Sequence, residues 1–271
     1  MIKKSVVRNM LPADLSLSGV FKQLRDAGFH GVQLLLGDEK GDVRLGMSDG
    51  ELRALKGEAD EAGIELHSFM PSGLAKLIDF DPAGRKRAVE HFERGLEIAG
   101  KMGVPTLLVH PGAVSEKAPY DLAYSWLSHA FSQLAPVAEQ HHCALAVENV
   151  WNKFLLSPLE ARDFVDSFNT PAVRFYFDVG NIILYGFAEQ WVRILGERIA
   201  EVHFKDFRRA AGTGAGFVPL LAGDVNWPAV MKELHAINYQ GYVSAELGVY
   251  AHSVEQTIRD ASSAMDAILK M

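Results

Sequence analysis

Four side chains of the types that bind divalent cations each follow a short apolar stretch in the second half of the chain. They are Glu148 after ALAV, Asp178 after VRFYF, His203 after IAEV and Glu246 after YVSA. Three carboxylates that share a small site cannot all stay ionised without a counter-charge, which a divalent cation supplies. Mostly oxygen ligands with one imidazole suit Mn²⁺ best, Mg²⁺ or Co²⁺ next, and Zn²⁺ less well. The pattern indicates one divalent cation per subunit, and four ordinary hydrogen-bonded polar residues remain the alternative.

Eight β-rich segments alternate with segments of helical length. The latter have apolar residues at a period of 3.6, as in 82–101, where Phe92, Leu96 and Ala99 share a face. Eight such alternations in 271 residues predict an α/β protein, a (β/α)8 TIM barrel. We expect a single domain over residues 1–271. The β-rich segments lie near 4–11, 30–36, 64–70, 104–110, 144–150, 173–179, 199–205 and 241–247.

The predicted barrel explains how four distant side chains form one site. The carboxyl ends of all barrel strands meet at one face, and active sites lie there. The four candidate ligands end strands five to eight, at separations that suit one βα repeat each. A doubly wound sheet is the rival fold, but it normally has a glycine-rich phosphate-binding turn after its first strand. This chain has NMLP (9–12) at that place.

Helix starts carry a recognisable signal. Ser48, Ser157 and Ser253 are each followed three residues later by Glu or Gln, which is the capping-box pattern. We therefore expect helices to begin directly after these serines.

Composition limits the classes of function. The chain is 48% hydrophobic and carries a net charge of −7, which favours a large core and disfavours nucleic acid as the partner. Cys143 is the only cysteine, so no internal disulfide can form. We see neither an apolar run long enough for a membrane span nor a signal peptide, because Arg8, Asn9 and Pro12 interrupt the N-terminal region. We expect a cytoplasmic protein without a membrane partner.

Several longer motifs resemble a known family. The motif GFHGVQL (28–34) is similar to a second-strand motif of the xylose isomerase-like TIM barrels, in their sugar phosphate isomerase/epimerase branch. Later blocks extend the resemblance over nearly the whole chain, with L-xylulose-5-phosphate 3-epimerases, or hexulose-6-phosphate isomerase-like proteins, as the nearest subgroup. These blocks are ENVWNKFLLSPLEARDF (148–164), YFDVGNIILYG (176–186), EVHFKDFRR (201–209) and GFVPLLAGDVNWPAVMKEL (216–234).

The resemblance implies roles for the strand-end residues. Metal ligands of the family's 3-epimerases fall on Glu148, Asp178, His203 and Glu246, and the two glutamates also act as the acid/base pair. The implied reaction is epimerisation of a ketose or ketose phosphate beside its carbonyl, through a metal-stabilised enediolate. No organic cofactor is implied, and dimers or tetramers are common among relatives.

Further residues are predicted to contact the sugar. The resemblance places Arg209 at a substrate-binding arginine, and Asn181 stands where many relatives have histidine, where its amide can still bond a hydroxyl. His67 and His110 also end predicted strands, so we expect both to line the pocket. Lys153 and Arg209 are candidates to bind a phosphate group of the substrate, as are Lys205 and Arg208. Lys205 could instead form an ion pair with Asp206.

Three other functions remain alternatives. A sugar-derivative dehydratase or an aldose–ketose isomerase would use the same barrel and metal. The motif HPG (110–112) resembles a zinc-binding stretch of apurinic endonucleases. Those enzymes also need an Asp-x-His pair after strand seven, and this chain has no histidine between His203 and His235. A non-catalytic sugar-binding barrel is the third alternative, against which the complete ligand set argues.

Overall fold

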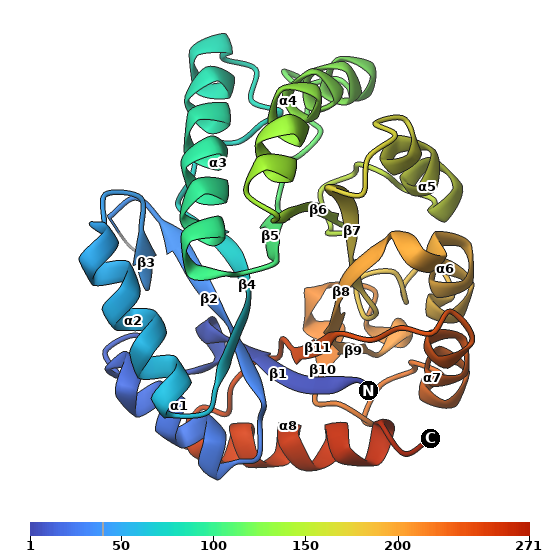
Figure 1. Cartoon of the computed structure of the whole chain (residues 1–271). Coiled ribbons are helices and arrows are strands. Elements are labelled where there is room, and N and C mark those ends of the chain that lie inside the picture. Colours follow the sequence, from blue (N-terminus) through green and yellow to red (C-terminus); the bar gives the residue numbers. More distant parts are fainter. Residues whose placement is uncertain (40) are drawn as a thin grey trace. The chain divides into compact units, whose positions relative to one another are not determined.

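Eight parallel strands form a closed barrel in the computed structural model, which describes residues 1–39 and 41–271 (Figure 1). The strand order is β1-β11-β8-β7-β6-β5-β4-β2, and β2 pairs with β1 to close the ring. The predicted TIM barrel fold is confirmed. The barrel strands are β1 (Lys3–Val7), β2 (Gly31–Gly37), β4 (Glu65–Ser72), β5 (Thr106–Val109), β6 (Ala144–Glu148), β7 (Val173–Asp178), β8 (Ile199–Phe204) and β11 (Tyr242–Ala245).

One α-helix follows each barrel strand in the chain. The helices are α1 (Leu17–Asp26), α2 (Asp49–Glu61), α3 (Pro82–Met102), α4 (Tyr120–Gln140), α5 (Pro158–Asp166), α6 (Ala188–Leu195), α7 (Trp227–Ala236) and α8 (Val254–Ile268). The predicted caps form: the Glu51 N–H donates to Ser48 Oγ over 3.3 Å, and Glu51 Oε2 accepts from the Ser48 N–H over 2.8 Å. Short elements fill the connections: β3 (Val43–Arg44), β9 (Asp206–Phe207), β10 (Phe217–Val218), η1 (Arg8–Met10), η2 (Gly196–Arg198), η3 (Arg209–Ala211) and η4 (Gly214–Gly216).

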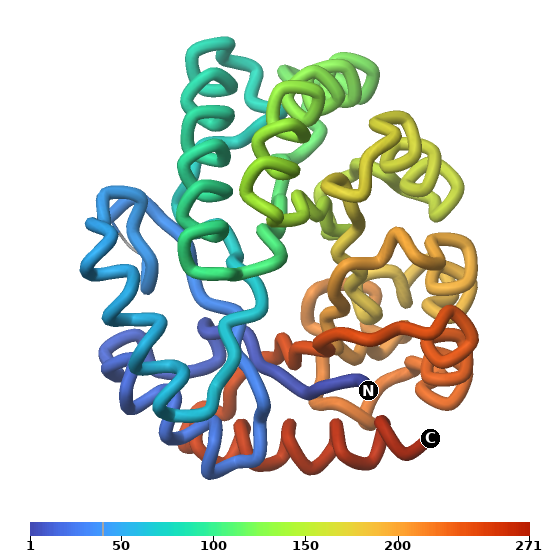
Figure 2. The backbone as a smooth tube through the Cα atoms, in the orientation of Figure 1, coloured from blue at the N-terminus to red at the C-terminus, as the bar shows by residue number. Residues whose placement is uncertain are grey.

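The chain divides into two compact units, so one domain over residues 1–271 stays a prediction. Unit 1 comprises Met1–Gln33, Lys56–His67 and Phe177–Met271, and unit 2 comprises Leu34–Leu55 and Ser68–Tyr176. Both chain termini, marked N and C in Figure 2, belong to unit 1.

Unit 1 holds β1 between β2 and β11. Ser5 pairs with Ser244 of β11, and Ser244 pairs with His203 of β8. Val6 of β1 and Val202 of β8 are fully buried. The register therefore fixes the height of His203 in the unit.

Unit 2 is held by an aromatic cluster on α4 and α5. The rings of Phe131 and Phe164 meet edge to face at 5.4 Å, and Phe168 lies 5.1 Å from Phe164. In the same unit α3 approaches the strands at Gly95, where a Cβ would lie 2.7 Å from Leu36. This packing supports β5 and β6.

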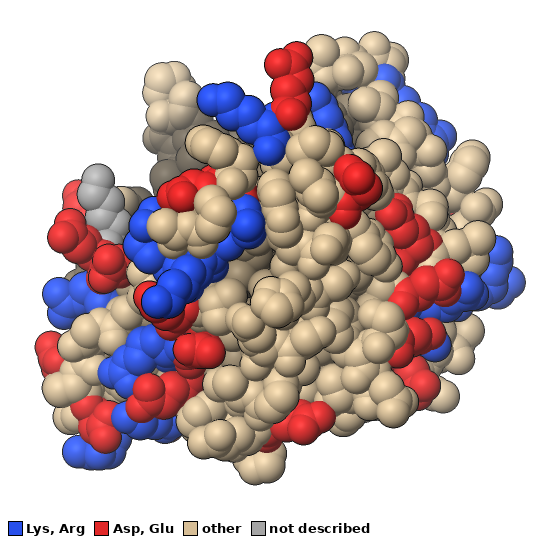
Figure 3. Space-filling view, turned by 90° about the horizontal axis from the view of Figure 1, so that it is seen from above, with Lys and Arg blue, Asp and Glu red and all other residues tan. Residues whose placement is uncertain are grey.

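Charged side chains of both signs are interspersed on the face drawn in Figure 3, with uncharged residues between them. Among the described residues, no helix is both long enough and apolar enough to cross a membrane.

Candidate metal centre

The four predicted ligands come together in space. Glu148 ends β6, Asp178 ends β7, His203 lies one residue before the end of β8, and Glu246 directly follows β11. Each offers one ligand atom, and these atoms all lie within 4.8 Å of one another. The first three residues are buried and Glu246 is half-buried. Their proximity is what the strand-end pattern predicts, while their binding of a cation stays a prediction.

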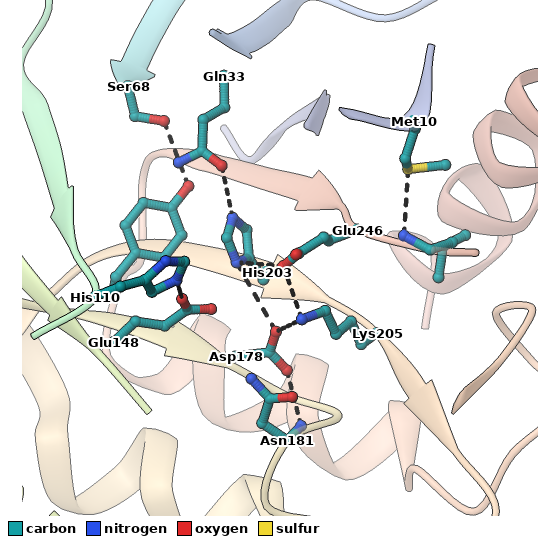
Figure 4. Close-up of polar contacts among 12 residues, drawn as sticks. Met10, Gln33, Ser68, His110, Glu148, Asp178, Asn181, His203, Lys205 and Glu246 are labelled. Atoms are coloured by element: carbon teal, nitrogen blue, oxygen red, sulfur yellow. Dashed lines mark hydrogen bonds and ion pairs between the residues drawn. The ribbon is translucent and has the colours of Figure 1, made fainter. Parts of the chain in front are cut away.

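The His203 imidazole is held between an amide and a carboxylate of unit 1. Its Nε2 lies 2.9 Å from Gln33 Oε1, and its Nδ1 lies 3.0 Å from Glu246 Oε2 (Figure 4). An amide oxygen only accepts hydrogen bonds, so Nε2 carries the proton and donates to Gln33. In the neutral ring the Nδ1 lone pair then faces the carboxylate. Nδ1 is the ring atom available to a cation.

Lys205 places a positive charge next to the carboxylates of Asp178 and Glu246. Its Nζ lies 3.0 Å from Asp178 Oδ2 and 2.8 Å from Glu246 Oε2. The Lys205 side chain is only 16% exposed, so water screens these ion pairs weakly. Lys205 does not pair with Asp206, because the Asp206 carboxylate accepts from the N–H groups of the 207–227 segment instead. That expectation is wrong, and Lys205 belongs to the carboxylate cluster.

Asp178 is oriented by the loop that follows it. The backbone N–H of Asn181 donates to Asp178 Oδ1 over 2.8 Å, while Oδ2 faces Lys205. Asn181 is 4% exposed, and any contact from it to a sugar hydroxyl stays a prediction.

In unit 2, Glu148 contacts a histidine from the neighbouring strand. His110 directly follows β5, and its Nε2 contacts Glu148 Oε2. The Glu148 side chain is 1% exposed and the His110 side chain 29%. The prediction that His110 follows a strand is confirmed, and the contact gives it a partner that the sequence did not indicate.

His67 lies away from a strand end. It is the third residue of β4, which continues to Ser72, so the expectation that His67 ends a strand is wrong. Its Nε2 lies 2.6 Å from Ser5 Oγ and its Nδ1 3.3 Å from Glu201 Oε1, and its ring stacks on Tyr242 at 4.1 Å. Burial raises the pKa of Glu201, although His67 opposes that shift. A sugar contact by His67 stays a prediction.

The two predicted phosphate-binding cations lie on exposed loops. Arg209 Nε donates to the Ile183 carbonyl over 2.8 Å, and its guanidinium lies 5.2 Å from the Phe187 ring. Lys153 lies in the loop after β6 with φ of +62°. These contacts tie Arg209 to the loop after β7 and leave phosphate binding by either residue a prediction.

Sequence reasoning did not predict the contacts of Gln33 and Lys205 with the candidate ligands, although it named Lys205 as a candidate to bind a phosphate. Gln33 is 0% exposed within the otherwise apolar strand GVQLLLG, and a buried amide in such a strand needs a polar partner. That requirement is the signal that could have identified Gln33. Lys205 follows His203 by two residues, which placed it near the site without showing which carboxylates it contacts.

A separate groove of about 720 Å³ lies in unit 2 along α3 and α4. Arg85, Glu93, Trp126 and Gln133 are among its lining residues, and none of the four candidate ligands is. The groove therefore does not belong to the candidate metal centre.

Comparisons with known proteins relate the chain to a family with this fold. A family model described as xylose isomerase-like TIM barrel matches residues 21–268. The chain is 27% identical over 258 residues to SgbU of Escherichia coli (strain K12), whose name provisionally assigns it as an L-ribulose-5-phosphate 3-epimerase. That alignment covers 89% of this chain and 87% of SgbU.

Two solved structures have the same fold. D-psicose 3-epimerase, solved in the presence of D-fructose, superposes with a TM-score of 0.82 at 18% identity, covering 99% of this chain and 100% of that chain. The IolI protein with a bound zinc atom superposes with a TM-score of 0.82 at 17% identity, covering 99% of this chain and 98% of that chain. At such identities the likeness shows the fold alone.

Proposed function

Because the chain belongs to the xylose isomerase-like TIM barrel family, we propose that it is a metal-dependent 3-epimerase of a ketose or ketose phosphate. The reaction removes a proton from the carbon beside the carbonyl and returns one to the opposite face. The observation that carries this proposal is the cluster of Glu148, Asp178, His203 and Glu246. The names of SgbU and D-psicose 3-epimerase support the same type of reaction.

The residues present fit a divalent cation. The Nδ1 lone pair of His203 and Glu246 Oε2 lie 3.0 Å apart, and they repel each other unless a proton or a cation lies between them. Three carboxylates and one imidazole are a donor set that suits Mn²⁺, with Mg²⁺, Co²⁺ and Zn²⁺ as alternatives. When bound, the cation supplies Lewis-acid stabilisation of the negative charge that develops on the carbonyl oxygen.

The two glutamates are the proposed acid/base pair. A carboxylate is a weak base towards a carbon-bound proton, so its position must be fixed before transfer. Glu148 is held by His110, and Glu246 is held by His203 and Lys205. We assign one glutamate to proton removal and the other to proton return.

Substrate recognition is assigned to the surrounding loops. We propose that Arg209 and Lys153 bind a phosphate group, because both are exposed and positively charged, while Asn181, His67 and His110 contact the sugar. The phosphorylated substrate in the name of SgbU supports the phosphate assignment. On the same grounds we propose a cytoplasmic enzyme of carbohydrate metabolism.

The test is proton exchange at a defined carbon. Metal-free protein is supplied with Mn²⁺ and incubated with L-ribulose 5-phosphate in D₂O, and the products are identified by NMR. We expect L-xylulose 5-phosphate with deuterium at C3. Glu246→Gln should lower kcat by roughly 10²- to 10⁴-fold, because it removes one acid/base group. Glu90→Gln, at an exposed position of α3, is the control and should leave kcat unchanged.

Other outcomes identify the alternatives. An aldose product with deuterium at C2 indicates an aldose–ketose isomerase, loss of water indicates a dehydratase, and nicking of abasic plasmid DNA indicates an endonuclease. Full activity of Glu246→Gln contradicts the acid/base assignment.

A further inference from the structure

Lys205 stands out among the residues around the candidate metal centre because it is a cation inside a site proposed to bind a cation. Its Nζ contacts Asp178 Oδ2 and Glu246 Oε2, at 3.0 and 2.8 Å. Both of these residues are candidate ligands. A carboxylate oxygen that coordinates a divalent cation has less electron density to offer an ammonium group, and the two positive charges repel each other.

Local structure holds Lys205 in this position. Gly180, in the loop after β7, lies so close that a Cβ there would be 2.5 Å from Lys205 Cβ. The absence of a side chain at Gly180 lets the backbone of residue 205 approach that loop. The ammonium group is therefore placed at the carboxylates by the fold and does not reach them from a flexible surface position.

The ammonium group also has an aromatic neighbour. Lys205 Nζ lies 5.7 Å from the centroid of the Phe217 ring, on β10, within the range of a cation–π contact. Phe217 is in turn fixed edge to face against Phe207 at 5.1 Å. An ammonium group that moves off the carboxylates towards this ring would keep an attractive partner for its charge.

We propose that Lys205 is a built-in counter-ion of the metal-free site, which a divalent cation displaces from Asp178 and Glu246 when it binds. This inference rests on the proposed metal site. In the metal-free protein, Lys205 offsets the repulsion between the carboxylates and keeps the site assembled. On metal binding its two ion pairs must break, so Lys205 lowers the affinity for the cation and makes metal uptake reversible.

The test compares metal affinity and stability in two variants. Lys205→Met keeps most of the length of the side chain and removes its charge, whereas Lys205→Arg keeps the charge. Affinity for Mn²⁺ is measured by isothermal titration calorimetry, and Tm is measured by circular dichroism in EDTA and at saturating Mn²⁺. We expect Lys205→Met to bind Mn²⁺ about tenfold more tightly or better, and Lys205→Arg to stay within about threefold of the wild type.

Stability gives an independent readout. In EDTA, Lys205→Met should melt several degrees below the wild type, and most of that difference should disappear at saturating Mn²⁺. Lys101→Met is the control, because Lys101 also forms two ion pairs, with Asp49 and Glu97, but on the surface of unit 2. It should leave the Mn²⁺ affinity unchanged.

The outcomes separate this inference from the proposed function. If the wild-type protein binds no divalent cation, the proposed function fails. If the wild type binds Mn²⁺ and Lys205→Met binds it equally or more weakly, while its circular dichroism spectrum is native, the counter-ion role of Lys205 is overturned and the metal site stands.

Discussion

At the scale of single residues, His110 has a contact that gives it a role beyond lining the pocket. Its Nε2 contacts Glu148 Oε2, and the Glu148 side chain is 1% exposed, so His110 holds a buried carboxylate that the proposed mechanism needs in one orientation. Partners that orient ligands in this way typically change affinity or activity by about 10- to 100-fold when they are removed.

We therefore predict that His110→Ala lowers kcat by about 10- to 100-fold while KM changes less, because the orientation of Glu148 matters most in the transition state. His110→Gln, which can still donate to Glu148, should restore part of the activity. His129→Ala, which removes a histidine from α4, is the control. A large rise in KM with an unchanged kcat would contradict the positioning role and leave His110 only its proposed sugar contact.

The clustering of the four candidate ligands could be predicted at this scale because strand ends are visible in a sequence. Glu148 and Asp178 each close a run of apolar residues, and a polar residue there is a local signal. The contacts of Gln33 and Lys205 could not be predicted in the same way, because they depend on side-chain directions and on neighbours far away in the chain. Lys205 and Glu246, for example, are 41 residues apart in the sequence.

At the scale of elements, the connection from β8 to α7 is organised around one buried carboxylate. Asp206, 1% exposed, accepts from the N–H of Leu221 over 2.9 Å and from Trp227 Nε1 over 3.1 Å. Gly223 passes so close that a Cβ there would lie 2.1 Å from Asp206 Oδ1 and 2.7 Å from the Phe207 backbone nitrogen. These two atoms are bonded to each other, because the Phe207 N–H donates to Asp206 Oδ1 over 2.9 Å, so a shift of either one weakens that bond.

Gly223→Ala should therefore destabilise the protein by about 1–3 kcal/mol, the usual range for overpacking, measured by urea unfolding. Gly214→Ala is a matched control in the same connection, because nothing lies within 4 Å of a Cβ at Gly214. Equal stability of the two variants would show that the Asp206 loop can relax around the added methyl group.

An ion-pair network on α3 has a pH dependence that can be tested. Hydrogen bonds from Arg94 and then Lys101 lower the pKa of Glu97 from its usual 4.5 to about 2. A depressed carboxyl pKa contributes stability above the unfolded value, and this contribution is lost as the pH falls from about 4.5 towards 2. Because Glu97 and its two partners are partly exposed, we expect their ion pairs to contribute about 1 kcal/mol at most to the free energy of unfolding.

We predict that the wild type exceeds Glu97→Gln in free energy of unfolding at pH 6 and that the difference shrinks as the pH is lowered below 4.5. Urea unfolding at a series of pH values measures this difference in free energy of unfolding. Glu93→Gln, on the same helix, is the control for loss of one charge. A difference that grows at low pH would contradict the assigned direction.

The barrel strands themselves were predictable, whereas the short pairings between them were not. Each of the eight β-rich segments overlaps one observed barrel strand, and five contain that strand entirely, since buried parallel strands leave continuous apolar runs. The antiparallel pair of β9 and β10 is only two residues long on each side, and it depends on Phe217 reaching Phe207 across a glycine-rich loop. No local pattern specifies such a contact.

At the scale of the whole molecule, the eightfold alternation predicted a closed barrel because parallel strands joined by helices must cover both faces of their sheet. Closure depends on β1 pairing with both β2 and β11, which are far apart in sequence. The number of repeats indicated that closure, while the sequence did not indicate where the chain divides into compact units.

The chain's one cysteine provides a probe that connects barrel stability with metal binding. Cys143 is 1% exposed, and burial raises the pKa of its thiol to about 12, so the reactive thiolate is scarce in the folded protein. Cys143 directly precedes β6, the strand that ends in Glu148. An opening that exposes the thiol should therefore displace a candidate metal ligand.

We predict that Mn²⁺ slows the reaction of Cys143 with 5,5′-dithiobis(2-nitrobenzoic acid) according to how fully the site is occupied. If the cation binds only the closed form and opening is at equilibrium, the labelling rate falls by about 100-fold at 100 times Kd. The rate is followed by absorbance at increasing Mn²⁺, with glutathione as the control for direct effects of the cation on the reagent. A labelling rate that stays constant while calorimetry shows Mn²⁺ binding would mean that β6 opens without releasing Glu148 from the site.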